Sequence, residues 1–241
     1  MPSPAAVPAA DSGLNNPVWQ FYSVYYAGTR GPCEELHAAL DNDASVAALN
    51  GSLALCALES AVSEGMMSLG LLMGTDAGTY ASDVQGAANG SGSIAAAEDD
   101  GTQALSFLYE DGTALTGTLN EYQMEYVFTG EPAYTLRLCK AAQGWAARLT
   151  YAEGGGYALR TSAQGIIEFC MLNIPPESLP EEDAAPPQAD APEDLVPAVI
   201  PLPTPAAPLA QQSEEAWEAA LQGAQTTYRM GQDGVLVIKY N

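Results

Sequence analysis

The chain has 241 residues, 47% of them hydrophobic, and its 30 acidic residues against 7 lysines and arginines give a formal net charge of -23. This charge argues against a nucleic-acid partner, because phosphate backbones are bound by lysine and arginine. A chain of this length and composition buries one substantial core, so we expect a single domain followed by a tail.

The start of the chain predicts a spacer. Residues 2–10 are rich in proline and alanine, and the first residues lack the basic and then apolar order of a signal peptide. We expect residues 1–16 to be a disordered spacer behind a removed signal or lipid anchor, which predicts an extracellular or surface-tethered protein. A cytosolic protein with a disordered start is the alternative. No run of about 18 apolar residues is present, so we expect no transmembrane segment.

The next region gives two competing signals. Residues 19–27 are dense in aromatic and β-branched side chains, which favours a strand. Asn16 as an N-cap, Pro17 in the first turn and Gly28 after the last turn are instead typical of a helix. We predict the strand.

A short helix is predicted over residues 32–40. It carries His37, the one histidine of the chain, and because no nucleophile with a supporting carboxylate can be assigned to it, we interpret His37 as a surface residue. Further on, Asn50-Gly51 predicts a hairpin, although its alanine-rich flanks also allow helices. More short strands are expected at residues 66–73, 80–85 and 93–96.

Residues 103–172 set the architecture. Short apolar and β-branched runs alternate with turn residues at intervals of about 8–12, the spacing of an antiparallel sheet. The predicted three-residue loops each end in glycine and lie at 110–112, 153–155 and 163–165. Two-residue loops are predicted at 120–121 and 143–144, and a wider loop at 130–132. Counting through these loops puts one apolar row on one face, because a slip of one residue would turn every side chain over. The row is Phe107, Leu115, Tyr126, Leu136, Tyr151, Tyr157 and Met171.

The four cysteines predict neither a zinc site nor another cofactor. Cys33, Cys56, Cys139 and Cys170 show no CxxC spacing, and only one histidine accompanies them. Cys139 and Cys170 are expected three strands apart, about 14 Å, which is too far for a disulfide. A bond between Cys33 and Cys56 remains the one alternative to free thiols, which we expect.

The composition changes after residue 172. Residues 174–212 mix proline, alanine and acids, so we expect an extended linker behind a folded domain of residues 17–173. Residues 213–241 predict a short helix capped by Ser213 and then a hairpin around residues 232–234. So small a segment is expected to dock on the main sheet.

Parts of the sequence resemble a known family. Residues 19–29 (WQFYSVYYAGT), the following Glu34-Glu35-Leu36 and residues 105–119 (LSFLYEDGTALTGTL) resemble the small secreted lipocalin-like domains of Gram-positive bacteria. The resemblance spans roughly residues 19–172 and implies an up-and-down β-barrel of eight to ten strands. It implies no catalytic motif. The fold prediction is therefore a mainly β, barrel-like antiparallel meander with a short N-terminal helix.

Two faces of this sheet carry candidate sites. The inward aromatic side chains suit a cavity for a small amphipathic ligand, and the alternative is a packed core. The predicted ligand-binding residues are Tyr126, Tyr134, Trp145, Tyr151 and Tyr157. On the opposite face, Arg137, Arg148 and Arg160 predict an anion site, because guanidinium groups match planar oxyanions. Cross-strand pairing with Glu125 and Glu168 is the alternative, but two acids leave one of the three arginines unmatched.

No sequence pattern assigns a reaction. The chain contains no P-loop, dinucleotide fingerprint, nucleophile elbow or HExxH. We therefore expect a non-catalytic domain that binds a small ligand or a surface partner. One alternative is a structural or adhesion module with a filled core and an exposed apolar patch or sheet edge. The other is a carbohydrate-active enzyme that uses acidic residues.

Overall fold

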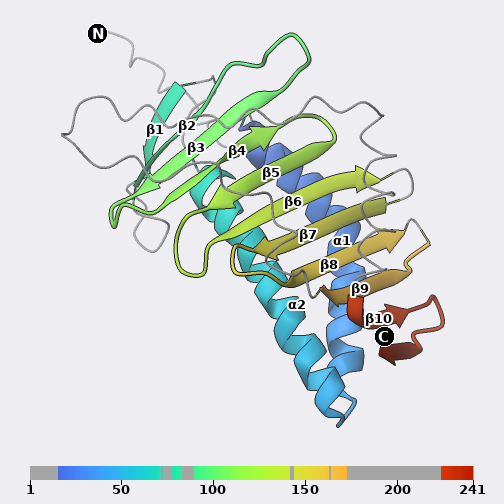
Figure 1. Cartoon of the computed structure of the whole chain (residues 1–241). Helices are drawn as coiled ribbons and strands as arrows, with labels where there is room; N and C mark the ends of the chain where they lie inside the picture. Colours follow the sequence, from blue (N-terminus) through green and yellow to red (C-terminus); the bar gives the residue numbers. More distant parts are fainter. Residues whose placement is uncertain are drawn as a thin grey trace, which may run out of the picture.

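In the computed structural model, two helices pack against one face of a single antiparallel sheet (Figure 1). The structure describes residues 16–70, 72, 78–82, 90–141, 144–162, 164–172 and 224–240. The helices are α1 (Pro17–Asp41), α2 (Val46–Gly65) and a π-helical segment, η1 (Met66–Gly70), that continues α2. The strands are β1 (Gly78–Ser82), β2 (Gly90–Ile94), β3 (Gln103–Tyr109), β4 (Ala114–Leu119), β5 (Gln123–Phe128), β6 (Tyr134–Ala141), β7 (Gly144–Tyr151), β8 (Gly156–Ser162), β9 (Ile167–Leu172), β10 (Ala224–Met230) and β11 (Leu236–Tyr240).

The sheet is an open meander. Its 11 strands follow one another in chain order, each antiparallel to its neighbours, which confirms the mainly β, antiparallel prediction. The end strands β1 and β11 do not pair with each other, so the expected closure into a barrel is wrong. The two helices explain the difference. A barrel buries the apolar face of its sheet by closing the sheet on itself, whereas here α1 and α2 cover that face and share one core with the strands (Figure 1).

Residues 17–41 form one long helix, so the strand predicted over residues 19–27 is wrong. The Asn16 side chain caps the helix by accepting hydrogen bonds from the backbone N–H groups of Val18 (2.9 Å) and Trp19 (3.1 Å). The helix continues through Gly28 and absorbs the short helix predicted at residues 32–40. One apolar face recurs every three or four residues along its whole length: Val18, Phe21, Tyr22, Tyr25, Thr29, Cys33, Leu36 and Leu40.

The hairpin predicted at Asn50-Gly51 is also wrong, because both residues lie inside α2. Ser45 caps this helix, and its hydroxyl accepts a hydrogen bond from Ala48 N–H at 3.1 Å. Residues 66–70, expected to begin a strand, continue the helix as η1. β1 and β2 do overlap the strands predicted at residues 80–85 and 93–96.

Among the described residues, the segment Val46–Gly70 is long and apolar enough to cross a membrane by length and composition. A buried core helix meets the same criterion. Here the segment packs against α1 and the sheet, and Leu55, Leu58 and Leu69 are buried in the common core.

The predicted faces of the sheet are confirmed, although three registers differ. Phe107 opposes Leu115, Tyr126 opposes Leu136 and Tyr157 opposes Met171, as expected. At the other three hairpins the pairing is displaced by two residues, so that Leu115 opposes Phe128, Leu136 opposes Leu149 and Leu149 opposes Tyr157. At the β4–β5 connection, for example, residues 120–122 form the loop, and Asn120 N–H donates a hydrogen bond to the carbonyl of Gln123 at the start of β5. A shift of two residues keeps each side chain on its face.

The C-terminal hairpin extends the sheet. β10 pairs with β9 as well as with β11, and the Tyr228 hydroxyl donates a 2.8 Å hydrogen bond to the Ala47 carbonyl of α2. Of the spacer expected at residues 1–16, only Asn16 is described, and it is the buried N-cap of α1. The linker expected at 174–212 and the helix beginning at Ser213 lie outside the described residues.

Candidate functional site

The aromatic residues predicted to bind a ligand form contacts between the sheet and the helices. Tyr126, Tyr134 and Trp145 are buried, and Tyr151 and Tyr157 are partly buried against the same core. The Trp145 ring meets Phe21 and Tyr25 of α1 edge-on, with centroids 5.5 and 5.4 Å apart. The Tyr126 hydroxyl donates to the Ala61 carbonyl of α2. These contacts are those of a packed core.

The three predicted arginines do lie together on the face of the sheet opposite the helices. Arg137 pairs with Glu125, and Arg160 donates to Glu168 at 2.7 Å. Arg229 of β10 approaches the same Glu168 at 3.5 Å. Arg148 stands directly opposite Arg137 on the neighbouring strand, and its Nε is buried without a hydrogen-bond partner among the described residues. Burial and the charge of Arg137 lower the pKa of Arg148.

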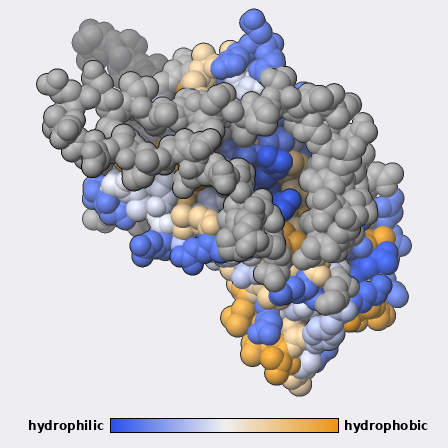
Figure 2. All heavy atoms as spheres, viewed as in Figure 1, coloured by the Kyte–Doolittle hydropathy of each residue, from blue (hydrophilic) through white to orange (hydrophobic). Residues whose placement is uncertain are grey.

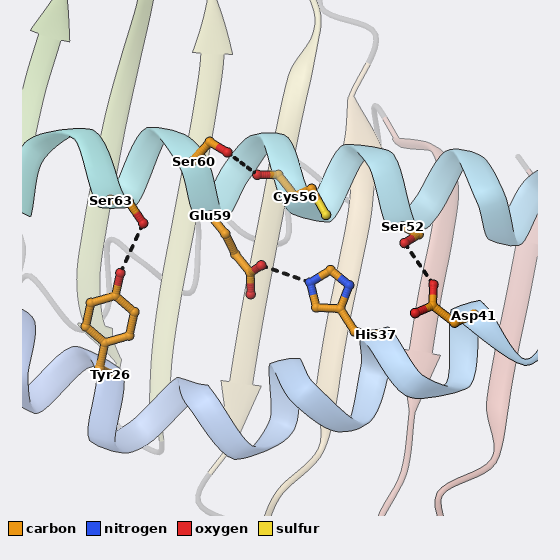
Figure 3. A network of polar contacts seen from close by, with 8 residues as sticks. All are labelled: Tyr26, His37, Asp41, Ser52, Cys56, Glu59, Ser60 and Ser63. Atoms are coloured by element: carbon orange, nitrogen blue, oxygen red, sulfur yellow. Dashed lines mark hydrogen bonds and ion pairs between the residues drawn. The ribbon is translucent and has the colours of Figure 1, made fainter. Parts of the chain in front are cut away.

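A groove of about 490 Å³ opens between α1 and α2 and reaches the sheet at Leu159. Three polar contacts join the two helices (Figure 3), and the first two of them lie at this interhelical groove. His37 Nε2 lies 2.9 Å from Glu59 Oε2, the hydroxyls of Tyr26 and Ser63 are 3.4 Å apart, and Ser52 donates to Asp41 at 3.2 Å. Leu58, Val62 and Leu159 are buried and form the apolar floor. The groove therefore combines an apolar floor with a polar rim.

The groove does not favour nucleophilic catalysis. Cys33 and His37 lie one helical turn apart on α1, and the Glu59 carboxylate contacts the imidazole. These are the residue types of a catalytic cysteine, its histidine base and the acid that orients the base. Burial, together with the charges of Glu59 and Glu34, raises the pKa of the Cys33 thiol to about 12. Reactive cysteines require the opposite shift, because the thiolate is the nucleophile. All four cysteines are free, as predicted.

Metal binding finds no support in the described part of the chain. No group of three or more histidine, cysteine or acidic side chains there is arranged to hold a metal ion.

The outer face of α2, which points away from the sheet, carries exposed apolar side chains. Val46, Leu49 and Leu53 are 74%, 59% and 62% exposed, and Cys56 follows them on the same side. The helical pair projects past the strands at the turn between α1 and α2 (Figure 1), and Figure 2 shows hydrophobic residues gathered at this end. We name Val46, Leu49, Leu53, Cys56 and Ser60 the α2 outer face.

Sequence reasoning missed this face and the partner of His37. The α2 outer face was hidden because its residues were assigned to a hairpin; read as a helix, their spacing is visible. Glu59 lies 22 positions from His37 on another helix, and no local spacing indicates that contact. Comparison of the chain with known protein families, with curated proteins and with solved structures found no match.

Proposed function

We propose that this protein is a non-catalytic interaction module that self-associates through the α2 outer face. The observation that carries the proposal is the row of three large aliphatic side chains, Val46, Leu49 and Leu53, left more than half exposed on a helix. Contiguous exposed apolar surface of this kind is typical of protein–protein contacts.

The spacing favours a helix as the partner. Val46, Leu49, Leu53, Cys56 and Ser60 follow one another at alternating steps of three and four residues. This is the repeat that keeps one seam of a helix facing a second helix in a coiled coil. The α2 outer face of a second copy supplies such a helix, and a two-fold dimer would match the face with itself.

The α2 outer face begins in an uncharged part of the helix. The first 13 residues of α2, up to Leu58, contain no charged side chain, so two copies can meet there without like charges in contact. Burying a valine or leucine contributes about 1.5–3 kcal/mol, and three from each copy give on the order of 10 kcal/mol. Association costs about 4–15 kcal/mol. The surplus is small, so we expect a reversible dimer with a Kd in roughly the micromolar to millimolar range.

The Leu49→Glu, Leu53→Glu double variant is expected to be monomeric wherever the natural chain dimerises. Sedimentation velocity over about 5–500 µM protein measures this. Raising the salt from about 20 to about 500 mM is expected to strengthen the natural dimer, because salt screens the repulsion between two acidic copies while the apolar seam stays intact.

Val24→Glu provides the matched control, since Val24 is an apolar residue 54% exposed on α1 outside the seam. This variant is expected to dimerise like the natural chain. A natural chain that stays monomeric over the whole concentration range, or a double variant that still dimerises, would refute self-association through α2.

A second candidate function is the binding of a small amphipathic ligand in the interhelical groove. Its volume of about 490 Å³ lies within the range of about 300–1,000 Å³ seen for small-molecule sites. The Glu59 carboxylate at the rim, over the floor of Leu58, Val62 and Leu159, favours a ligand with an apolar body and a cationic head.

Phenethylamine is expected to bind in this groove with a millimolar Kd, and phenylacetate, which has the same ring with a carboxylate, is expected to bind at least about fivefold more weakly. Isothermal titration calorimetry measures both. Glu59→Gln is expected to remove the preference, whereas Glu110→Gln in the β3–β4 loop is expected to keep it. Equal affinity for the two probes would contradict this function.

A further inference from the structure

Among the arginines of the described strands, Arg148 is the one for which no ion pair with a glutamate is seen. It lies on β7, on the face that the helices do not cover, opposite Arg137 of β6. Its Nε is buried and has no hydrogen-bond partner among the described residues, and no ion pair is seen for its guanidinium there. Buried polar groups are almost always hydrogen-bonded, so an unpaired guanidinium donor calls for a partner.

Among the described residues, the charges around Arg148 do not balance. Between β5 and β10, the face opposite the helices carries four arginines and two glutamates in the described strands. Arg137 is held by Glu125, while Arg160 and Arg229 both reach Glu168. Each glutamate is therefore already engaged. The cross-strand neighbour of Arg148 on β8 is Ala158, and Ala146 precedes it on the same face; neither side chain can accept a hydrogen bond.

We propose that Arg148, with Arg137 beside it, forms a binding site for an oxyanion, either a carboxylate or a phosphate group. The planar guanidinium presents parallel N–H donors that match two oxygens of such an anion. Arg137 adds positive charge from the next strand, and the anion supplies the acceptor that the buried Nε lacks. The site lies on the opposite side of the sheet from α2, so it is independent of self-association.

Calorimetric titration of the full chain with sodium acetate, sodium phosphate and sodium chloride at matched ionic strength tests the site. Acetate or phosphate is expected to bind one site with a millimolar Kd, and chloride is expected to show no saturable binding. The better ligand of the first two identifies the source of the oxyanion as a carboxylate or a phosphate. Arg148→Gln is expected to weaken binding at least about tenfold, since it removes a charged, forked donor.

Arg229→Gln is the matched control, because Arg229 lies on the same face but is 55% exposed and already paired with Glu168. It is expected to bind the anion within about twofold of the natural chain. If Arg148→Gln fails to fold, Arg148→Lys keeps the charge without the fork and is expected to bind several-fold more weakly. Saturable chloride binding equal to that of acetate and phosphate, or an Arg148 variant with unchanged affinity, overturns the proposal.

Discussion

Replacing Tyr126 with alanine is expected to lower the free energy of unfolding by about 3–5 kcal/mol, the range for removing a large aromatic side chain from a core. The Tyr126 side chain is fully buried. Its ring packs 6.3 Å from that of Tyr134, and its hydroxyl donates to the Ala61 carbonyl of α2. The substitution therefore leaves a cavity between sheet and helix. Urea unfolding followed by circular dichroism measures the loss.

Tyr122→Ala is the control for this prediction. Tyr122 precedes β5 and is 44% exposed, so its removal is expected to change the stability by no more than about 0.5 kcal/mol. A Tyr126 side chain that lined a hollow ligand site would lose few packing contacts on truncation. A loss below about 1 kcal/mol for Tyr126→Ala would therefore contradict the packed core.

The sheet could be predicted because its signals are local. The last residue of these loops must adopt a left-handed backbone, which glycine does readily. Gly112 and Gly165 adopt it with φ of 87° and 76°. Alternation along each strand then fixes which face is buried. Alternation does not fix the registers around residues 120, 143 and 154. When the centre of a loop moves by one residue, the strand pairing shifts by two residues, so each side chain keeps its face but changes its partner.

The helices could not be predicted from composition because tertiary packing outweighs intrinsic preference. Tyr22 and Tyr25 are typical of strands, yet with Val18 and Phe21 they recur at helical spacing, and all four are buried. Asn16 and Pro17 gave the correct signal at the helix start. Where the periodicity and the cap agree, they are stronger indicators than residue type.

The same difference between local signals and tertiary packing decides which candidate sites could be predicted. The arginine face followed from strand alternation and from counting charges, so Arg137, Arg148 and Arg160 could be predicted as a group. Which of the three arginines lacks an acid depends on register, because Arg148 opposes Arg137 and Ala158, whereas Arg160 opposes Glu168. The interhelical groove depends on two helices that local signals did not reveal.

Gly51→Val is expected to destabilise the protein by about 2–4 kcal/mol, because this glycine lets α2 approach the C-terminal hairpin. A Cβ atom at position 51 would lie 2.5 Å from Cε1 of Tyr228 and 3.1 Å from Cδ2 of Leu40. The Tyr228 ring cannot easily move, since it is fully buried and its hydroxyl is held by the Ala47 carbonyl at 2.8 Å. Thermal and urea unfolding measure the effect.

Alanine at the same position decides between two opposing effects. Within a helix, alanine is favoured over glycine by about 1 kcal/mol, whereas overpacking a filled core costs about 1–3 kcal/mol. For Gly51→Ala we expect the steric cost to be larger, with a net loss of about 1 kcal/mol. Gly31→Ala in α1 is the matched control, because a Cβ there would meet nothing within 4 Å apart from its chain neighbours. Since Pro32 follows and disfavours a Cβ on the preceding helical residue, this substitution is expected to change the stability by no more than about 0.5 kcal/mol.

A double-mutant cycle separates the contact with Tyr228 from any other cost at position 51. Tyr228→Leu removes the ring that the new Cβ would strike, so Gly51→Ala in that background is expected to be neutral or stabilising, with a coupling of about 1–2 kcal/mol. Absence of coupling would mean that Tyr228 does not pack on α2 at residue 51.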